Sequence, residues 1–340
     1  MKPTDFSKYL TLYLTSYLPS QRNVSKNTIS SYCDTFSLFL TFCKEYCDIS
    51  IEKLTLNQIS ADLVKNFLKW LEDKRDCCAS TCNQRLAAIH SFFRYVQVES
   101  PQNIYLYQKI IAIQYKKRNK PTVNYLTVED LKLILSQPDI TVPSGRRDLV
   151  LLSILYDTGA RVQELADLKV RHVRIDNPAK ACLTGKGRKS REVPLMSKTK
   201  TLLENYLIEQ NLTTPDKLDF PLFFNKQSTK LTRAGISYIL EKYTQQARVI
   251  SPNIPLVVTP HVLRHTKAMH LLQAGINIVY IRDILGHVDI STTEVYARAD
   301  TEMKRSALEK INCDSVVESL PSWASNADLM TWLKGFSKSL

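Results

Sequence analysis

Hydrophobic residues recur at helical spacing through the first third of the chain. Phe6 and Leu10 open the pattern, and aromatic stripes follow in residues 28–42 and 83–96. Because each stripe would lie on one face of a helix, we interpret these aromatic residues as core rather than as stacking platforms for bases. The pattern predicts an all-α helical bundle over residues 1–112, which would form an N-terminal domain.

The apolar period lapses in residues 113–124, which read IQYKKRNKPTVN. One interpretation of this basic stretch is a solvated linker between two domains. The other is a strap that closes the domains around a nucleic-acid duplex, with basic side chains on phosphates. The two interpretations are compatible, and we favour the strap. Its candidate DNA contacts are Lys116, Lys117, Arg118 and Lys120.

A second helical pattern begins at Tyr125 and predicts a larger domain over residues 125–312. Thr127, followed by acidic residues, has the form of a helix start. Residues 181–195 depart from the helical pattern, because short apolar segments flank a Gly-Lys-Gly turn as in a β-hairpin. We therefore expect a mainly α domain with a small β-sheet, an α+β arrangement. Its main predicted helices cover residues 146–156, 202–210 and 232–248.

The composition is that of a soluble globular protein long enough for two domains. Of the 340 residues, 44% are hydrophobic and 23% are charged. No uncharged apolar run reaches the length of about eighteen residues that would span a membrane. The N-terminal segment carries early charges and lacks a small-residue cleavage site, so it does not resemble a signal peptide. We expect a cytoplasmic protein.

The net charge is strongly basic along the whole chain. Lys and Arg number 46 against 33 Asp and Glu, giving +13. Residues 1–120 hold 17 basic and 10 acidic residues, a net +7, and the remaining 29 and 23 give +6. This spread fits a protein that wraps a polyanion such as double-stranded DNA with two domains, and so associates with the nucleoid. The alternative is charge that serves only solubility.

Eight cysteines are unevenly placed, and in an intracellular basic protein we expect them to be reduced thiols. Cys43 and Cys47 are four residues apart, as are Cys78 and Cys82, which raises the alternative of a zinc site. Most zinc modules have a closer cysteine spacing, and these segments are predicted to be helical. We therefore expect no metal.

The candidate chemistry lies in residues 259–298. His261, Arg264 and His265 are spaced i, i+3 and i+4, so they share one face of a helix. An arginine fork beside imidazoles suits a phosphate group held in a cleft. Tyr296, further along, is either a structural residue or a nucleophile.

A second candidate arginine lies at a predicted helix start. Gly159 supplies a turn, so Arg161 would lie beside free backbone N–H groups. Alone, an arginine in such a place is usually a surface residue. Glu164, three residues further on, is a candidate ion-pair partner for Arg161 or its neighbours.

Several strings of residues resemble a known family. His-Val-Leu-Arg-His at 261–265, Leu-Gly-His at 285–287 and Thr-Thr-Glu-Val-Tyr at 292–296 resemble the C-terminal signature of the tyrosine recombinases, the phage-integrase and Xer-like family. Residues 156–165 resemble the first arginine box of that family. The N-terminal helices resemble its SAM-like core-binding domain.

The resemblance implies a site-specific DNA recombinase or integrase, of the kind carried by mobile elements. Two arginines would hold the non-bridging phosphate oxygens, Tyr296 would attack the phosphorus, and His261 would accept its proton. His287 would donate to the phosphate or orient the tyrosine. The implied products are a 3′-phosphotyrosyl link and a free 5′-hydroxyl, with no ATP or other cofactor. The candidate catalytic residues are Arg161, Lys186, His261, Arg264, His287 and Tyr296.

In this family the hairpin carries a catalytic lysine, and here its tip is crowded with basic residues that include Arg191. Lys186, in the Gly-Lys-Gly turn, takes the role of protonating the departing 5′ oxygen, with Lys189 as the fallback. Further candidate DNA contacts in this domain are Arg188, Lys189 and Arg233.

Alternatives remain for the activity and for the assembly. The activity could instead be that of a tyrosine-dependent topoisomerase-like nicking-closing enzyme, or the chain could be a non-catalytic DNA-binding relative. The family implies a homo-oligomer, a dimer on each site and a tetramer in synapsis, or partner recombinases. The apolar tail at residues 313–340 docks on a neighbouring protomer or packs on its own domain.

Overall fold

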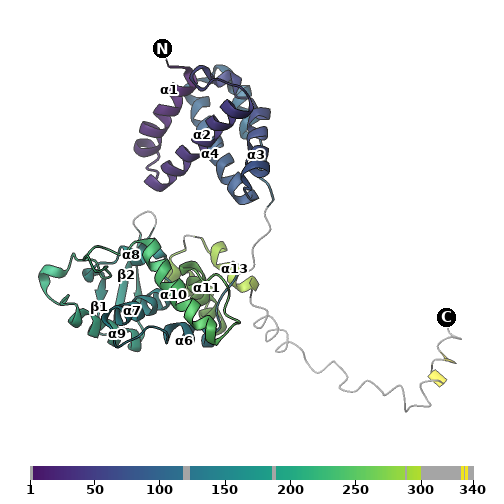
Figure 1. The fold of residues 1–340 in the computed structure, drawn as a ribbon. Helices are drawn as coiled ribbons and strands as arrows, with labels where there is room; N and C mark the ends of the chain where they lie inside the picture. The colour runs from purple at the N-terminus through teal and green to yellow at the C-terminus, as the bar shows by residue number, and fades with distance from the viewer. Residues whose placement is uncertain are drawn as a thin grey trace. The chain divides into compact units, whose positions relative to one another are not determined.

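The computed structural model describes residues 3–117, 123–185, 189–287, 289–299, 331–332 and 334–335. The chain divides into two compact units, Met1–Pro121 and Thr122–Leu340 (Figure 1). Among the described helices, none is both long and apolar enough to cross a membrane. Most of the tail at residues 313–340 lies outside the described residues. The expectation that it docks on a neighbouring protomer or on its own domain therefore stays a prediction.

All the regular elements in the described part of unit 1 are helices or helical turns. Short polar residues start its helices: the hydroxyls of Thr4, Ser25 and Ser60 each accept a hydrogen bond from the backbone N–H three residues on. The longer helices are α1 (Asp5–Leu12), the π-helix Tyr13–Gln21, α2 (Lys26–Tyr46), α3 (Ala61–Arg75), α4 (Ala79–Glu99) and α5 (Ile104–Ile111). Short 3-10 turns lie at Ile51–Lys53, Leu56–Gln58 and Pro101–Asn103.

Helix α4 lies at the centre of unit 1 and contacts α2, α3 and α5. Its Phe92 makes edge-to-face contacts with Phe6 and Phe36, at ring-centroid distances of 5.8 and 5.2 Å. All three rings are buried, and buried Tyr13 donates to Ser91 Oγ at 2.7 Å. The interpretation of the aromatic stripes as core is therefore confirmed.

Unit 2 combines helices with one small sheet, so the predicted fold class is confirmed. Its first half contains α6 (Val128–Leu135), α7 (Pro143–Thr158), α8 (Val162–Ala166), a 3-10 turn at Val170–His172, β1 (Val173–Arg174), β2 (Lys180–Thr184) and β3 (Ser190–Pro194). Its second half contains α9 (Ser197–Glu209), a 3-10 turn at Pro215–Lys217, α10 (Arg233–Ile250), α11 (Pro260–Gln273), α12 (Ile278–Leu285) and α13 (Ser291–Ala299).

The sheet is antiparallel, with strand order β1-β2-β3. The predicted hairpin is formed by β2 and β3, in a register that pairs Ala181 with Val193 and Leu183 with Arg191. Strand β1 was not expected, because two residues are too few to show the alternation that marks a strand.

Helix α7 carries the core of unit 2 and leads into the site. It packs against α9 and α11, and Leu151, Leu152 and Leu155 are fully buried. The helix ends at Gly159, whose φ of 55° lies in the left-handed region that favours glycine. This turn sends the chain directly into α8, with Arg161 as the residue that precedes its first turn.

The basic segment after α5 is only partly described. The side chain of Asn83 on α4 holds Lys116 through its backbone N–H and its carbonyl, both at 2.9 Å, and the Lys116 ammonium pairs with Glu72. Lys117 is exposed, whereas Arg118 and Lys120 lie outside the described residues. DNA contact by these four residues stays a prediction.

Candidate active site

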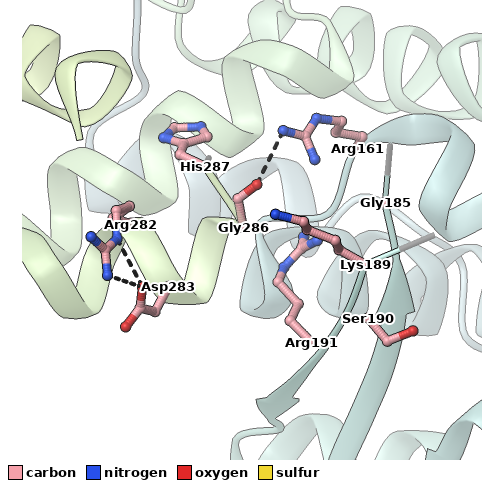
Figure 2. Close-up of a pocket in the computed structure, with 9 residues that line it drawn as sticks. All are labelled: Arg161, Gly185, Lys189, Ser190, Arg191, Arg282, Asp283, Gly286 and His287. Atoms are coloured by element: carbon pink, nitrogen blue, oxygen red, sulfur yellow. Dashed lines mark hydrogen bonds and ion pairs between the residues drawn. The ribbon is translucent and has the colours of Figure 1, made fainter. Parts of the chain in front are cut away.

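Segments distant in sequence line one basic pocket of unit 2, shown in Figure 2. The pocket has a volume of about 570 Å³ and is built from the start of α8, the β2–β3 hairpin and the end of α12. Its lining residues are Arg161, Gly185, Lys189, Ser190, Arg191, Arg282, Asp283, Gly286 and His287.

Glu164 on α8 lies buried between two arginines. Arg161 donates to its carboxylate through the backbone N–H at 2.9 Å and through Nη1 at 2.7 Å, which also caps the start of α8. Arg191 on β3 donates to both carboxylate oxygens, at 3.1 and 2.8 Å. Burial alone would raise the pKa of Glu164, but hydrogen bonds from Arg191 and Arg161 lower it to about 2. The expected pairing with Arg161 is confirmed, and the carboxylate fixes both guanidinium groups.

The C-terminal end of α12 accepts hydrogen bonds from three arginines on three other segments. The last carbonyls of a helix lack partners within it and carry the negative end of its dipole, so they suit cationic donors. The pairs are Arg191 Nε with Ile284 O at 2.8 Å, Arg264 Nη2 with Leu285 O at 2.5 Å, and Arg161 Nη2 with Gly286 O at 3.4 Å (Figure 2 shows the last).

Arg264 on α11 is the most enclosed cation of the site. Its side chain is 1% exposed, and Nη1 donates to Gly159 O at 2.7 Å. Burial, with the charges of Arg161 and Arg191, lowers its pKa to about 10, so it stays charged at neutral pH. Two of its five N–H groups bind the carbonyls of Gly159 and Leu285, which fixes the plane of the guanidinium.

Tyr296 on α13 is buried beside His265 and His287. Its hydroxyl lies 2.8 Å from His265 Nδ1, and its ring stacks on that of His287 at a centroid distance of 6.4 Å. His261, one helical turn before His265, places its ring 4.2 Å from the His265 ring. Burial raises the pKa of the Tyr296 phenol, although Arg264 and Arg161 act in the opposite direction. The phenol therefore keeps its proton at neutral pH.

The three imidazoles are neutral at neutral pH. Burial, together with nearby positive charge, lowers the pKa values of His265 and His287 to about 4. The pKa of His261 is lowered as well, by the protein around its ring and by Arg264. His287 Nδ1 lies 2.9 Å from the hydroxyl of buried Thr293, which leaves Nε2 as its outward nitrogen.

The arginines, the neutral imidazoles and the buried phenol of Tyr296 together suit attack on a phosphodiester. Preorganised guanidinium donors stabilise the negative charge that develops on a phosphodiester under attack, and the phenol is a nucleophile once its proton is removed. Within the described ranges, no three His, Cys, Asp or Glu side chains come together as a metal-ligand group.

Comparison with known proteins assigns the chain to a family. The phage integrase family matches residues 124–303, and the phage integrase N-terminal SAM-like domain matches residues 11–99. The chain belongs to the phage integrase family. This confirms the resemblance carried by the signature strings, and it makes the protein a tyrosine recombinase, an enzyme of site-specific DNA strand breaking and rejoining.

Curated relatives of this phage integrase family member are similar over most of their length. The Sinorhizobium fredii protein named "Putative integrase/recombinase y4rC" is 36% identical, covering 91% of this chain and 92% of its own. The tyrosine recombinase XerD of Listeria monocytogenes is 30% identical, covering 82% of this chain and 90% of its own.

Solved structures share the fold. XerH recombinase bound to a palindromic difH substrate, in a post-cleavage complex, has a TM-score of 0.67 at 22% identity, covering 85% of this chain and 81% of that one. The Tn1549 transposon integrase in complex with transposon right end DNA has a TM-score of 0.66 at 16% identity, covering 88% and 98%.

The structure of this phage integrase family member groups most of the predicted catalytic residues around the pocket and Tyr296. Those brought together are Arg161, His261, Arg264, His287 and Tyr296. Lys186 and Arg188 lie outside the described residues. Lys189 is exposed and lines the pocket, and Arg233 is exposed at the first residue of α10.

Two residues of the site, Arg191 and His265, were not among the predicted catalytic residues. Arg191 was grouped with the basic tip of the hairpin, but its side chain is only 12% exposed and points to Glu164 and α12. The signal was present, because Arg191 lies two residues from buried Val193 and so shares its face of the strand. His265 was not counted as catalytic, yet its ring nitrogen contacts the phenol.

Proposed function

We propose that this tyrosine recombinase cuts and rejoins duplex DNA at specific sites through a 3′-phosphotyrosyl link to Tyr296, without metal or ATP. The observation that carries the proposal is the Tyr296 hydroxyl, held at 2.8 Å by an imidazole and facing the charges of Arg264 and Arg161. The rings of His265 and His287 lie against that of Tyr296, and His261 contacts the His265 ring.

In the proposed reaction Arg161 and Arg264 bind the two non-bridging oxygens of the scissile phosphate. They stabilise the phosphorane-like transition state, in which negative charge on the non-bridging oxygens increases as the phenol oxygen approaches the phosphorus. His287 contacts the phosphate from the end of α12 or orients the tyrosine. A histidine of α11 takes up the phenol proton, and the signature motif assigns that role to His261. Lys186 protonates the 5′ oxygen as it leaves. The phosphotyrosyl bond conserves the energy of the cleaved bond, so rejoining needs no ATP.

We further propose that the enzyme serves a mobile element, in the cytoplasm at the nucleoid. Its partner is double-stranded DNA, bound by a dimer at each site and by a tetramer or partner recombinases in synapsis. The support is the net charge of +13 spread over both units and the structural likeness to a transposon integrase.

Covalent trapping tests the nucleophile. The full chain is mixed with a library of nicked duplexes. Cleavage near the nick releases a short fragment that carries the free 5′-hydroxyl, and because this fragment diffuses away the strand cannot be rejoined. The mixture is then digested with trypsin. The expected adduct lies on the peptide spanning residues 283–298, in which Tyr296 is the only tyrosine. Mass spectrometry identifies the attached 3′ nucleotide, and sequencing of the trapped DNA identifies the target.

The variant pair Tyr296→Phe and Tyr280→Phe separates chemistry from binding. Tyr280 on α12 is exposed, so its replacement should leave trapping unchanged. Tyr296→Phe should abolish the adduct and leave duplex affinity within about twofold, because the phenol makes no contribution to phosphate neutralisation. An adduct that survives in Tyr296→Phe would refute the assignment of the nucleophile.

A further inference from the structure

The three histidines of the site are not equivalent in their relation to Tyr296. His265 alone, within the described part of the chain, places a ring nitrogen at hydrogen-bond distance from the phenol oxygen, at 2.8 Å. The corresponding nitrogen of His287 is occupied by Thr293 at 2.9 Å. His261 is the most open of the three and contacts the His265 ring rather than the tyrosine.

The protonation states of the resting pair follow from its surroundings. His265 faces His261 and Arg264 from its own helix and Tyr296 from α13. Burial, together with His261 and Arg264, lowers its pKa to about 4. The phenol of Tyr296 is protonated, since burial raises its pKa. A neutral phenol therefore donates to a neutral imidazole, which requires His265 to carry its own proton on Nε2.

We propose that His265 is the catalytic residue that removes the phenol proton of Tyr296, and that His261 contacts the phosphate instead. This inference rests on the proposed function. As the phenol oxygen forms its bond to phosphorus, the proton moves to His265 Nδ1. The bond from phosphorus to the 5′ oxygen breaks, and that oxygen takes a proton from the general acid assigned to Lys186. In rejoining, His265 returns its proton to the departing tyrosine.

Substrate binding makes His265 a better base than it is at rest. Burial and neighbouring positive charge lower the basicity of its ring in the free protein. A phosphate bound between Arg161 and Arg264 adds negative charge to the same region and offsets those arginines. The imidazolium is then stabilised only when the phosphate is in place, which couples removal of the proton to the presence of DNA.

The variant His265→Asn tests the role directly. The asparagine oxygen lies near the position of Nδ1 and still accepts a hydrogen bond from the phenol, but it cannot take up the proton. On the nicked duplex that the wild-type full chain traps, the cleavage rate should fall about 100-fold or more, with duplex affinity unchanged within about twofold.

Helix α11 offers a matched control. His270 also places Nδ1 at hydrogen-bond distance from a tyrosine hydroxyl, 2.9 Å from that of Tyr156, but this tyrosine is not the proposed nucleophile. His270→Asn should cleave at close to the wild-type rate, because it disturbs an equivalent histidine–tyrosine pair without touching the nucleophile. Equal rates for His265→Asn and wild type would overturn the proposal.

Difluorotyrosine at position 296 supplies a second readout. Fluorine lowers the phenol pKa, so in the His265→Asn background it should restore much of the lost rate, increasingly as pH rises. A purely structural role for His265 predicts no such recovery. With His265 intact, the acid limb of the pH–rate profile should stay in place on fluorination, because it reports the imidazole; a limb that moves with the phenol would refute the role of His265.

These outcomes are separable from failure of the proposed function. A wild-type chain that forms no adduct at Tyr296 contradicts the proposed function itself. A wild-type chain that forms the adduct, with His265→Asn forming it equally fast, contradicts only the assignment of the base. Because the fluorotyrosine profile with intact His265 needs no destabilised variant, the inference stays testable if His265→Asn folds poorly.

Discussion

Replacing Glu164 by glutamine should destabilise unit 2 in a pH-dependent way. The folded state lowers the pKa of this carboxyl from 4.5 to about 2, and its side chain is almost fully buried. The difference corresponds to about 3 kcal/mol favouring the folded state at neutral pH. Because the folded pKa is the lower one, this stabilisation is complete above about pH 5 and falls to less than half by pH 3. Glu164→Gln should therefore lower the free energy of unfolding by about 3 kcal/mol at pH 7.

The measurement must resolve the two units. Equilibrium urea unfolding read by pulsed hydrogen exchange and mass spectrometry does so, because peptides from α7 and α11 report on unit 2 and those from α3 and α4 on unit 1. The loss should appear in the unit 2 peptides only. The gap between variant and wild type should narrow as pH falls from about 5 towards 2.

Glu192→Gln, on β3 next to Arg191, is the matched control. Glu192 also pairs with a cation, Lys180 at 2.6 Å, but its side chain is 58% exposed. Exposed pairs of this kind contribute less than about 1 kcal/mol. If Glu164→Gln costs no more than Glu192→Gln, or if its cost is the same at pH 3 and pH 7, the charge of the buried carboxylate does not stabilise the fold.

Two further substitutions test the arginine geometry. Arg264→Lys should reduce cleavage in the trapping assay about 100-fold or more, because an ammonium cannot bridge the carbonyls of Gly159 and Leu285 and still bind phosphate; near-normal cleavage would contradict the proposed clamp. Gly286→Ala should lower the free energy of unfolding by about 1–2 kcal/mol, since the residue has a φ of 64° and a Cβ would lie 2.9 Å from the Arg191 side chain. An unchanged thermal midpoint would show that the end of α12 adapts.

Local sequence patterns predicted most of the helices, because apolar spacing and helix capping depend on residues only a few positions apart. Helical spacing in residues 28–42 and 83–96 found the cores of α2 and α4, and the threonine at 127 marked the start of α6. The pairing of Glu164 with Arg161 was accessible for the same reason, since three residues separate them on one helix start.

The remainder depends on contacts that no local pattern records. Arg191 meets Glu164 across 27 positions, and it meets the end of α12 across 93. His265 and Tyr296 are 31 positions apart, so spacing placed both in one site but could not show which histidine bonds to the phenol. Helical spacing of apolar residues likewise gives no sign of the π-helix at Tyr13–Gln21.

The end of α12 has a consequence for how this chain tolerates change. Three consecutive carbonyls, those of Ile284, Leu285 and Gly286, accept hydrogen bonds from arginines on β3, α11 and α8. The spacing of these carbonyls therefore sets the spacing of the three guanidinium groups. Inserting one residue within α12 would rotate the carbonyls by about 100° about the helix axis and misplace all three arginines at once. Substitution of exposed α12 side chains outside the pocket, such as Tyr280, would leave these three hydrogen bonds in place, whereas a change in the length of the helix would not.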